Sequence, residues 1–411
     1  MIKYEKYQLK NGLTVIHHYD ANTPMVVVNV LYKVGAKNEN PAKTGFAHLF
    51  EHLMFGGSIN VPNFDTPLQL AGGDNNAFTN NDITNYYETL PAANIETALW
   101  VESDRMLQLD FSEQSLEVQR KVVCEEFKQR YLNQPYGDVW LKLRPLAYKT
   151  HPYQWATIGK ELSHIENASL KDVKEFFYKH YGPDNAILSI AGNISFDETV
   201  RLAEKWFGGI ENRNITKTNM PIEPLQNEER FETVKADVPQ KAIYKAYHMC
   251  DRLHVDFHAT DFMSDILSGG KSGRLLNKLV KEQKLFSDIN AYISGDIDAG
   301  LFVVEGRLND NITFEQAEEG ISIELIKLQQ ETVTDTELQK VKNKAESIFV
   351  FGQLNLMNKA MNLAFAENIG HIDWVNTELD LYNNVQKEHI QKVAKQVLVP
   401  TNCSTLYYEP K

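Results

Sequence analysis

The stretch GFAHLFEHLMFGGS, residues 45–58, sets the local fold of this chain and carries its most informative chemistry. Apolar residues recur through it at roughly helical spacing and Gly56-Gly57 supplies a stop signal, so we predict a helix here. Residues four apart on a helix share a face, so His48 and His52 present their imidazoles to one point. Glu51 lies beside them, one turn from His48. The stretch therefore predicts two metal ligands and a base within reach of one ion.

The H-x-x-E-H order of these residues is that of the inverted zinc-peptidase motif. A histidine packed in the core is the default explanation for a single histidine, but not for this trio in a chain with only 12 histidines in 411 residues. A chance match to the whole pattern is on the order of a few in a hundred. A catalytic zinc ion takes three protein ligands and leaves one position for water, so a further Asp, Glu, His or Cys must come from elsewhere.

The best source of a third ligand is a second predicted helix, from Ser112 to Leu132. Its apolar stripe is formed by Leu116, Val122, Val123 and Phe127. The helix contains two adjacent carboxylates, Glu125 and Glu126. Spacing alone does not choose between them, and each is equally well explained as an ordinary solvated charge.

Several separated stretches, in a fixed order, carry a resemblance to a known family. They are GFAHLFEHLMFGGS (45–58), GGDNNAFTNNDITNYYETLP (72–91), QRKVVCEEF (119–127), NQPYG (133–137), HPYQWATIG (151–159), YGPDNAILSIAGNI (181–194) and LSGGKSGRLLNKL (267–279). Over nearly its whole length the chain resembles the pitrilysin and mitochondrial processing peptidase family of inverzincins, in the two-domain form of roughly 400 residues. The resemblance implies a zinc metalloendopeptidase that binds one zinc ion per chain and hydrolyses peptide bonds.

The same resemblance assigns roles to individual residues. It makes His48, His52 and Glu126 the zinc ligands and Glu51 the general base, so that Glu125 points away from the metal. Many active relatives carry another glutamate two turns before the third ligand, where this chain has Gln119. A neutral amide there can hydrogen-bond the ligands, but it tunes their charge differently.

The stretch from 72 to 91 has a turn-rich Gly-Gly-Asp-Asn-Asn start followed by strand-like alternation. Taken as structure alone, it predicts an edge hairpin. By resemblance, Asn76, Ala77 and Phe78 form an edge strand that hydrogen-bonds an extended substrate, with Asn76 close to the scissile bond. Strand addition uses backbone contacts for affinity, which suits an unfolded peptide or a flexible segment as the substrate.

Length and composition exclude several classes of protein. The chain is 43% hydrophobic and 24% charged, which is typical of a globular protein large enough for two domains. Its formal charge of −13 argues against nucleic-acid binding and favours basic peptides. No apolar run approaches the roughly 18 residues of a membrane span, and the start lacks the apolar core of a signal peptide. Three widely spaced cysteines predict no disulfide framework. We expect a cytoplasmic protein with no membrane span.

A polar, proline-containing segment without sustained periodicity marks the predicted boundary between two halves. We divide the chain into a zinc-binding catalytic domain (1–210), a linker (211–232) and an inactive homologous domain (233–411). Each half begins with predicted strands, at 13–33 and at 241–248, and returns through further strands and helices. The predicted fold class is α+β, with two tandem homologous domains that each pack helices on a mostly antiparallel sheet.

Self-sufficient relatives carry an Arg and, seven residues later, a Tyr in the second half, and both reach the substrate at the zinc site. We place these positions at Val280 and Ser287, neither of which can donate as Arg and Tyr do. Arg274 and Tyr292 lie nearby and are better explained as structural residues. The resemblance therefore predicts a heterodimer in which a homologous partner subunit supplies the Arg and Tyr. A self-sufficient homodimer and a noncatalytic scaffold subunit are the alternatives, in that order.

Overall fold

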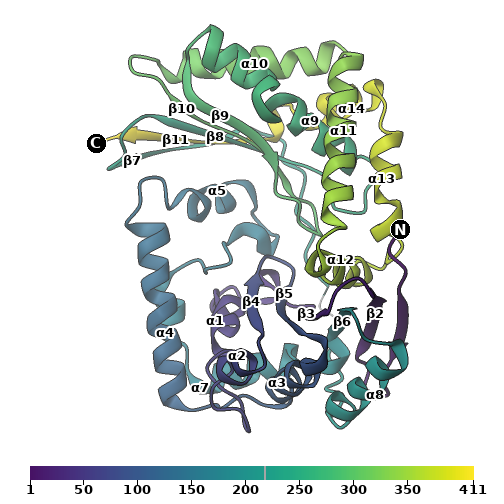
Figure 1. Ribbon diagram of the computed structural model, residues 1–411. Helices are drawn as coiled ribbons and strands as arrows, with labels where there is room; N and C mark the ends of the chain where they lie inside the picture. Colours follow the sequence, from purple (N-terminus) through teal and green to yellow (C-terminus); the bar gives the residue numbers. More distant parts are fainter. Residues whose placement is uncertain (217–218) are drawn as a thin grey trace. The chain divides into compact units, whose positions relative to one another are not determined.

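The computed structural model describes residues 1–216 and 219–411, which form two compact units (Figure 1). Unit 1 comprises Met1–Lys128, Trp155–Met220 and Val350–Thr377, and unit 2 comprises Gln129–Gln154, Pro221–Phe349 and Glu378–Lys411. Two segments belong to the other unit than the predicted domain boundaries assign. Residues 129–154 of the predicted first domain lie in unit 2, and residues 350–377 of the predicted second domain lie in unit 1. The first residues of β7 also fall inside the predicted linker, since this strand begins at Arg230.

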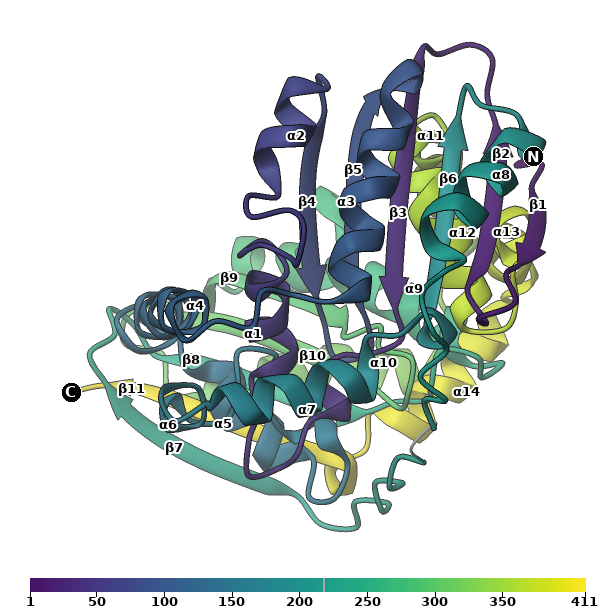
Figure 2. The same cartoon turned by 90° about the horizontal axis from the view of Figure 1, so that it is seen from below.

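Unit 1 is built on a six-stranded sheet with the order β1-β2-β6-β3-β5-β4 (Figure 2). Its strands are β1 (Glu5–Gln8), β2 (Thr14–Tyr19), β3 (Met25–Tyr32), β4 (Asp74–Thr79), β5 (Thr84–Pro91) and β6 (Ala186–Gly192). Only β2 and β6 pair in parallel; the other neighbours are antiparallel. Strand β4 is the last in this order, so it lies at one edge of the sheet, as the prediction of an edge hairpin required.

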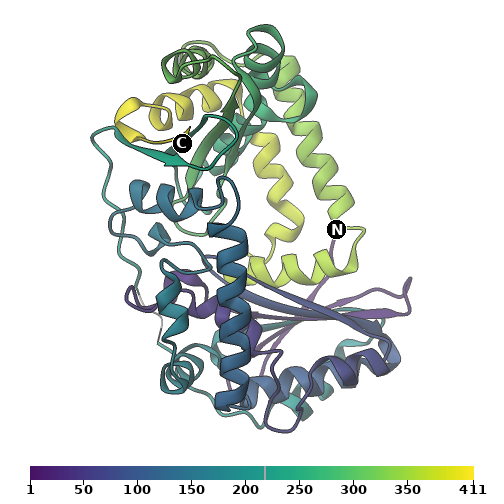
Figure 3. The same ribbon diagram turned by 90° about the vertical axis from the view of Figure 1, so that its left-hand side faces the viewer.

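The helices of unit 1 pack on its sheet or on one another. They are α1 (Phe46–Leu53), α2 (Asp65–Leu70), α3 (Ile95–Leu107), α4 (Glu113–Phe127), α6 (Leu162–Glu166), α7 (Leu170–His180), α8 (Phe196–Phe207) and α12 (Leu356–Asn368), with short 3-10 turns at Ala36–Asn38, Ala92–Asn94 and Pro183–Asn185. Helix α12 packs on β6, β3 and β2, and α3 packs on the opposite face (Figure 3). A helix from late in the sequence thus completes the core of the first unit.

Unit 2 is built on a five-stranded sheet with the order β7-β11-β8-β10-β9. Its strands are β7 (Arg230–Ala236), β8 (Ala242–His248), β9 (Phe286–Ile293), β10 (Leu301–Leu308) and β11 (Cys403–Pro410). Alternate residues of β8 and β10 enter two different cores, one under α5 and the other under α9, α10 and α14. This alternation is expected for a sheet that is covered on both faces.

The helices of the second unit follow the strands closely in sequence. They are α5 (Val139–Ala147), α9 (Phe257–Ser268), α10 (Phe314–Gln330), α11 (Asp335–Gly352), α13 (Trp374–Asn384) and α14 (Lys387–Val397), with π-helical turns at Lys128–Leu132 and Leu276–Glu282 and 3-10 turns at Pro152–Gln154, Gly270–Ser272 and Pro400–Asn402. The last exchange between the units falls within two of these helices: the chain enters unit 1 inside α11 and returns to unit 2 inside α13.

The two sheets share one strand order. Counted from β2 in the first sheet and from β7 in the second, both run 1-5-2-4-3, and strands 1 and 5 form the only parallel pair in each. The prediction of an α+β fold with two tandem domains is confirmed. Among the described residues, no helix combines the length and apolar character that a bilayer span requires.

Candidate metal centre

The helix predicted from the first stretch is α1, and its start is fixed by a close backbone contact. Gly45, which precedes the helix, has φ +85°, a left-handed conformation that favours glycine. A Cβ on Gly45 would lie 2.6 Å from the carbonyl oxygen of Ile158. The lack of a side chain therefore lets the first turn of α1 approach the segment around Ile158.

Helix α1 divides its residues as the sequence pattern predicts. Phe46, Ala47, Leu49, Phe50 and Leu53 are buried. The side chains of His48 and His52 are 13% and 24% exposed and share one face. Their rings stand nearly perpendicular, with centroids 4.9 Å apart. Two imidazoles are thus held together at the surface of unit 1.

Helix α4 packs against α1 and brings a carboxylate to these imidazoles. The Oε2 atom of Glu126 lies 3.4 Å from Nε2 of His52 and 3.7 Å from Nε2 of His48. Ligand atoms of the three residues all lie within 4.8 Å of one another. Atoms bound at about 2.0–2.1 Å to one tetrahedral zinc ion are about 3.4 Å apart, so this set of two nitrogens and one oxygen fits zinc.

The neighbouring carboxylate points elsewhere. The side chain of Glu125 is 61% exposed and forms an ion pair with Lys128 at 2.8 Å. Leu116, Val123 and Phe127 are buried on the other side of α4, whereas Val122, which we included in the same apolar stripe, is 45% exposed. Geometry therefore separates the two glutamates that spacing left equivalent.

Glu51 lies on α1 between the two histidines in sequence, and its charge affects the pKa values of two tyrosines of the sheet. The pKa of Tyr87 on β5 is raised by burial first, then by Asp74 and then by Glu51. Burial is also the main cause of the raised pKa of Tyr86, to which Glu51 contributes. The charge of Glu51 therefore reaches Tyr86 and Tyr87, two neighbouring residues of β5.

A residue that the sequence did not single out holds the start of α1. Glu39 is 6% exposed, and its carboxylate accepts hydrogen bonds from the backbone N–H groups of Gly45 and Ala47, both at 2.8 Å. Burial raises the pKa of Glu39 to about 8, although these hydrogen bonds act in the opposite direction. Helix starts leave N–H groups without intrahelical partners, and Glu39 satisfies two of them. Its place in a polar, aperiodic segment gave no sequence signal.

Gln119 lies on α4 two turns before Glu126 and is half-buried. Within the described residues, its amide forms no hydrogen bond with His48, His52 or Glu126. Its Nε2 atom instead lies near Gly56, 3.7 Å from where a Cβ of that glycine would stand. The structure thus places Gln119 beside the loop that follows α1.

Asn76, Ala77 and Phe78 lie on the edge strand β4, in register with Tyr87, Tyr86 and Asn85 of β5. Asn76 and Phe78 are exposed, and the Asn76 side chain accepts a hydrogen bond from the N–H of Ala77 at 2.8 Å. In the described part of the chain, no strand pairs with the outer edge of β4. The backbone groups of that edge are available to an added strand.

The positions discussed for the missing Arg and Tyr lie in unit 2. Val280 packs against the hydrophobic core of that unit, and Ser287 is exposed on β9. Arg274 forms a two-point ion pair with Glu337, with N–O distances of 2.6 and 2.9 Å. Tyr292 donates a hydrogen bond to Glu305 at 2.9 Å. Arg274 and Tyr292 are both engaged with carboxylates of their own unit.

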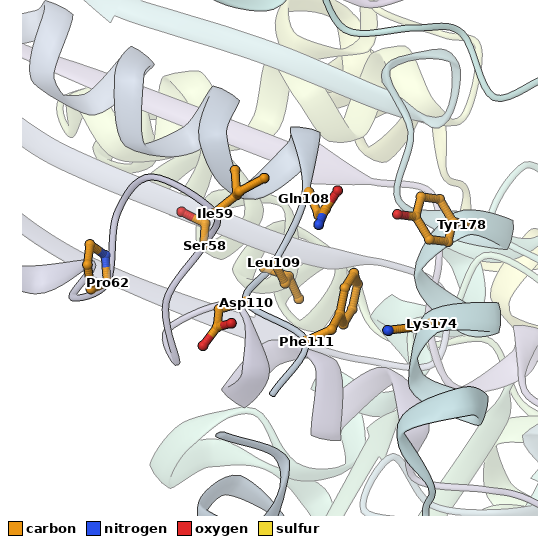
Figure 4. A pocket seen from close by; sticks show the side chains of 9 residues that line it. All are labelled: Ser58, Ile59, Pro62, Gln108, Leu109, Asp110, Phe111, Lys174 and Tyr178. Atoms are coloured by element: carbon orange, nitrogen blue, oxygen red, sulfur yellow. The ribbon is translucent and has the colours of Figure 1, made fainter. Parts of the chain in front are cut away.

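A cavity of about 500 Å³ lies elsewhere on unit 1 (Figure 4). Figure 4 shows Lys174 and Tyr178 of α7 on one side and Phe111 close to them. The ammonium group of Lys174 lies 5.7 Å from the centre of the Phe111 ring, within reach of a cation–π contact. None of the residues lining this cavity is a candidate ligand, base or substrate-binding residue.

Comparison with known families matches both halves of the chain. Residues 14–158 match the family described as "Insulinase (Peptidase family M16)", and residues 167–345 match the "Peptidase M16 inactive domain". The candidate ligands and base therefore all fall within the first match.

Individual proteins similar to this chain are also named as proteases or peptidases. The zinc protease PqqE of Helicobacter pylori is 31% identical over 99% of this chain and 93% of its own length. A probable mitochondrial-processing peptidase subunit beta of Schizosaccharomyces pombe is 29% identical over 76% of this chain and 72% of its own length. A crystal structure of a protease from Helicobacter pylori superposes with a TM-score of 0.93 at 30% identity, and the match covers both chains completely.

Proposed function

The chain belongs to the peptidase M16 family, and from that premise we propose that it is a zinc metalloendopeptidase that cleaves unstructured peptides or flexible segments. The observation that carries this proposal is the meeting of His48, His52 and Glu126, whose ligand atoms lie within 4.8 Å of one another. A noncatalytic scaffold subunit has no need of this set of ligands beside a carboxylate base.

Each residue of the centre has a distinct task in the proposal. His48, His52 and Glu126 hold one zinc ion. When bound, zinc supplies Lewis-acid chemistry, lowering the pKa of water toward about 7 and polarising a carbonyl group. Glu51 accepts the proton of the attacking water and delivers it to the amine nitrogen of the leaving group. The peptide C–N bond is hydrolysed without a covalent acyl-enzyme.

The substrate binds as an added strand on β4. No described strand pairs with the outer edge of β4, so this edge offers backbone N–H and C=O groups. Exposed Asn76 and Phe78 alternate with half-buried Ala77 along it. Backbone pairing requires an extended substrate and is indifferent to most of its sequence. Asn76, Ala77 and Phe78 therefore select for unfolded segments rather than for a fixed sequence.

Catalysis requires a second, homologous subunit in this proposal. By resemblance we place Val280 and Ser287 at the positions where self-sufficient relatives carry an Arg and a Tyr. Arg274, which lies nearby in sequence, is paired with Glu337. One donor to the developing oxyanion contributes roughly 3–4 kcal/mol in hydrolases. A partner that supplies the Arg and Tyr restores this stabilisation. A cytoplasmic location is part of the proposal, and all three cysteines are free thiols in the structure.

The test combines zinc analysis with peptide cleavage. The purified chain is assayed for bound zinc and for cleavage of a mixed pool of unstructured peptides, alone and with a homologous chain from the same organism that lacks H-x-x-E-H. We expect one zinc per chain and activity that rises at least tenfold when the partner is added. Full activity of the chain alone would replace the heterodimer with a homodimer, and failure to bind zinc would refute the proposed catalysis.

A further inference from the structure

A cavity of about 470 Å³ opens beside the N-terminal end of the edge strand β4. It lies wholly within unit 1. Its walls come from β4 and the turn before it, from β5, and from one methionine each of β3 and α12. The side chains that define its chemistry are Met25, Asp74, Asn76, Tyr87, Thr89 and Met357.

The strand register explains why these side chains meet. Asp74 pairs with Thr89 and Asn76 pairs with Tyr87 across the antiparallel ladder. Paired residues point to the same face of a sheet, and so do residues two apart on one strand. Asp74, Asn76, Tyr87 and Thr89 therefore form one cluster, on the face that α12 covers farther along the sheet.

The cavity has one formal charge, and it is negative. Asp74 is exposed, and no other described residue forms a hydrogen bond or ion pair with its carboxylate. None of the nine residues that line the cavity is a lysine or an arginine. The hydroxyl groups of Tyr87 and Thr89 also lack hydrogen bonds to the rest of the described chain. The Asp74 charge is thus presented to whatever enters the cavity.

Tyr87, which lines the cavity, is affected by the charge of the candidate catalytic base. The charges of Asp74 and Glu51 both raise the pKa of Tyr87, after the larger effect of burial. The Tyr87 phenol is thus within the influence of both carboxylates. Asp74 precedes Asn76 by two residues, which is about 6.6 Å along a strand. A peptide strand added to β4 therefore carries one of its side chains past this cavity.

The chemistry of the walls fits a long cationic side chain. The thioethers of Met25 and Met357 offer apolar contact for a methylene stem. The Asp74 carboxylate pairs with an ammonium or guanidinium group, and the Tyr87 ring offers a cation–π contact. An acidic side chain meets an uncompensated like charge at the same place.

We propose that this cavity is a substrate subsite for a lysine or arginine side chain, with Asp74 as its counter-ion. The inference rests on the proposed peptidase function and adds to it a preferred residue at a defined place on the bound strand. The formal charge of −13 raises the general concentration of basic peptides near the chain, whereas Asp74 discriminates at one position.

The experiment measures binding and turnover separately. A zinc-loaded Glu51→Gln chain is titrated with short fluorescent unstructured peptides that carry a single lysine, or norleucine in its place, at successive positions. The ratio of the two Kd values reports the subsite without any cleavage. The matched control is Asp197→Asn, which removes the same charge from an exposed position on α8. The same peptide pairs are then used to measure kcat/KM with the otherwise unaltered chain and its partner.

We expect one peptide position at which lysine binds about 2- to 5-fold more tightly than norleucine, as an exposed ion pair allows. Asp74→Asn should bring this ratio close to one, Asp74→Lys should reverse it so that norleucine binds more tightly than lysine, and Asp197→Asn should leave it unchanged. A preference for lysine at that position that survives in Asp74→Asn would overturn the proposal. An equal increase in the Kd values of the lysine and norleucine peptides in Asp74→Asn would also overturn it. If Glu51→Gln retains the lysine selection but the chain with Glu51 intact cleaves none of the peptides in the presence of its partner, the proposed catalysis is refuted and the subsite is supported.

Discussion

The Nε2 atom of His52 lies 3.4 Å from the Oε2 atom of Glu126, although the two residues belong to different helices. The distance follows from the packing of α1 against α4. Both helices carry buried apolar residues, among them Leu49 and Phe50 on α1 and Val123 and Phe127 on α4. The ligand atoms are therefore brought together by the contact between the two helices.

Replacing Glu126 with glutamine should abolish stable zinc binding. The substitution leaves the helix and its buried face intact but removes the charged oxygen that completes the set of ligands. The loss of zinc affinity should exceed the roughly 10- to 100-fold effect of removing a residue that only supports a ligand. Competitive titration with a chromogenic chelator measures it.

Glu125→Gln is the matched control for that experiment. It removes the same charge from the adjacent position, where the side chain pairs with Lys128. Its zinc affinity should stay within a factor of a few of the unaltered chain, because exposed ion pairs contribute little. Equal losses in both variants would contradict the assignment of Glu126 as the ligand.

Replacing Glu51 with glutamine should separate metal binding from turnover. The amide keeps the shape of the side chain but cannot accept a proton, so kcat should fall by about 10²- to 10⁴-fold in the presence of the partner. Zinc content, measured by elemental analysis, should not change. Unchanged kcat in a fully zinc-loaded variant would rule out Glu51 as the base.

The sequence predicted the parts of the centre that depend on local spacing. His48, Glu51 and His52 are fixed by the helical period, and the apolar pattern around them predicted α1 correctly. Glu126 was chosen by family resemblance alone, since both carboxylates of α4 fit the spacing. Only the packing of the two helices distinguishes it from Glu125 in physical terms.

The remaining features depend on contacts between distant segments. Glu39 binds the start of α1 from an aperiodic polar segment, and Asp74 acquires its neighbours from the register of β4 with β5. Helix α12 completes the first unit from late in the sequence, where composition gives no sign of this exchange. Periodicity describes which face of an element is apolar but does not say which element will cover it.

Glu39 should make the thermal stability of the chain depend on pH. Its folded-state pKa of about 8 lies above the ordinary value of 4.5, so the folded chain holds a proton that the unfolded chain releases. The contribution of Glu39 to stability is therefore greatest below about pH 4.5 and is lost as the pH rises toward 8, by roughly 1 kcal/mol per pH unit. Glu39→Gln removes this loss.

Melting temperatures of both chains, measured between pH 5 and pH 8 with a chelator present, test the Glu39 prediction. The Tm of the unaltered chain minus the Tm of Glu39→Gln should fall steadily with rising pH. The exposed Glu125→Gln variant should run parallel to the unaltered chain. A constant difference for Glu39→Gln would mean that the N–H groups of Gly45 and Ala47 hold the carboxylate ionised throughout.

Arg274 should prove structural rather than catalytic. Its two hydrogen bonds to Glu337 are the main cause of the lowered pKa of that carboxyl, about 2 against an ordinary value of 4.5. A lowered pKa stabilises the folded chain above about pH 4.5, and this contribution is lost as the pH falls toward 2. Arg274→Gln should therefore lower Tm by several degrees at pH 7 and by much less at pH 3.

The partnered enzyme distinguishes this structural role from a catalytic one. Because the Arg274 guanidinium is occupied by Glu337, kcat/KM of folded Arg274→Gln with the partner should stay within about twofold of the unaltered chain. Arg307→Gln serves as the comparison for Tm, since its pair with Asp288 is about half exposed and should contribute little. A loss of kcat/KM beyond tenfold at unchanged zinc content would instead show that Arg274 leaves Glu337 to bind substrate, and would remove the reason for requiring a second subunit.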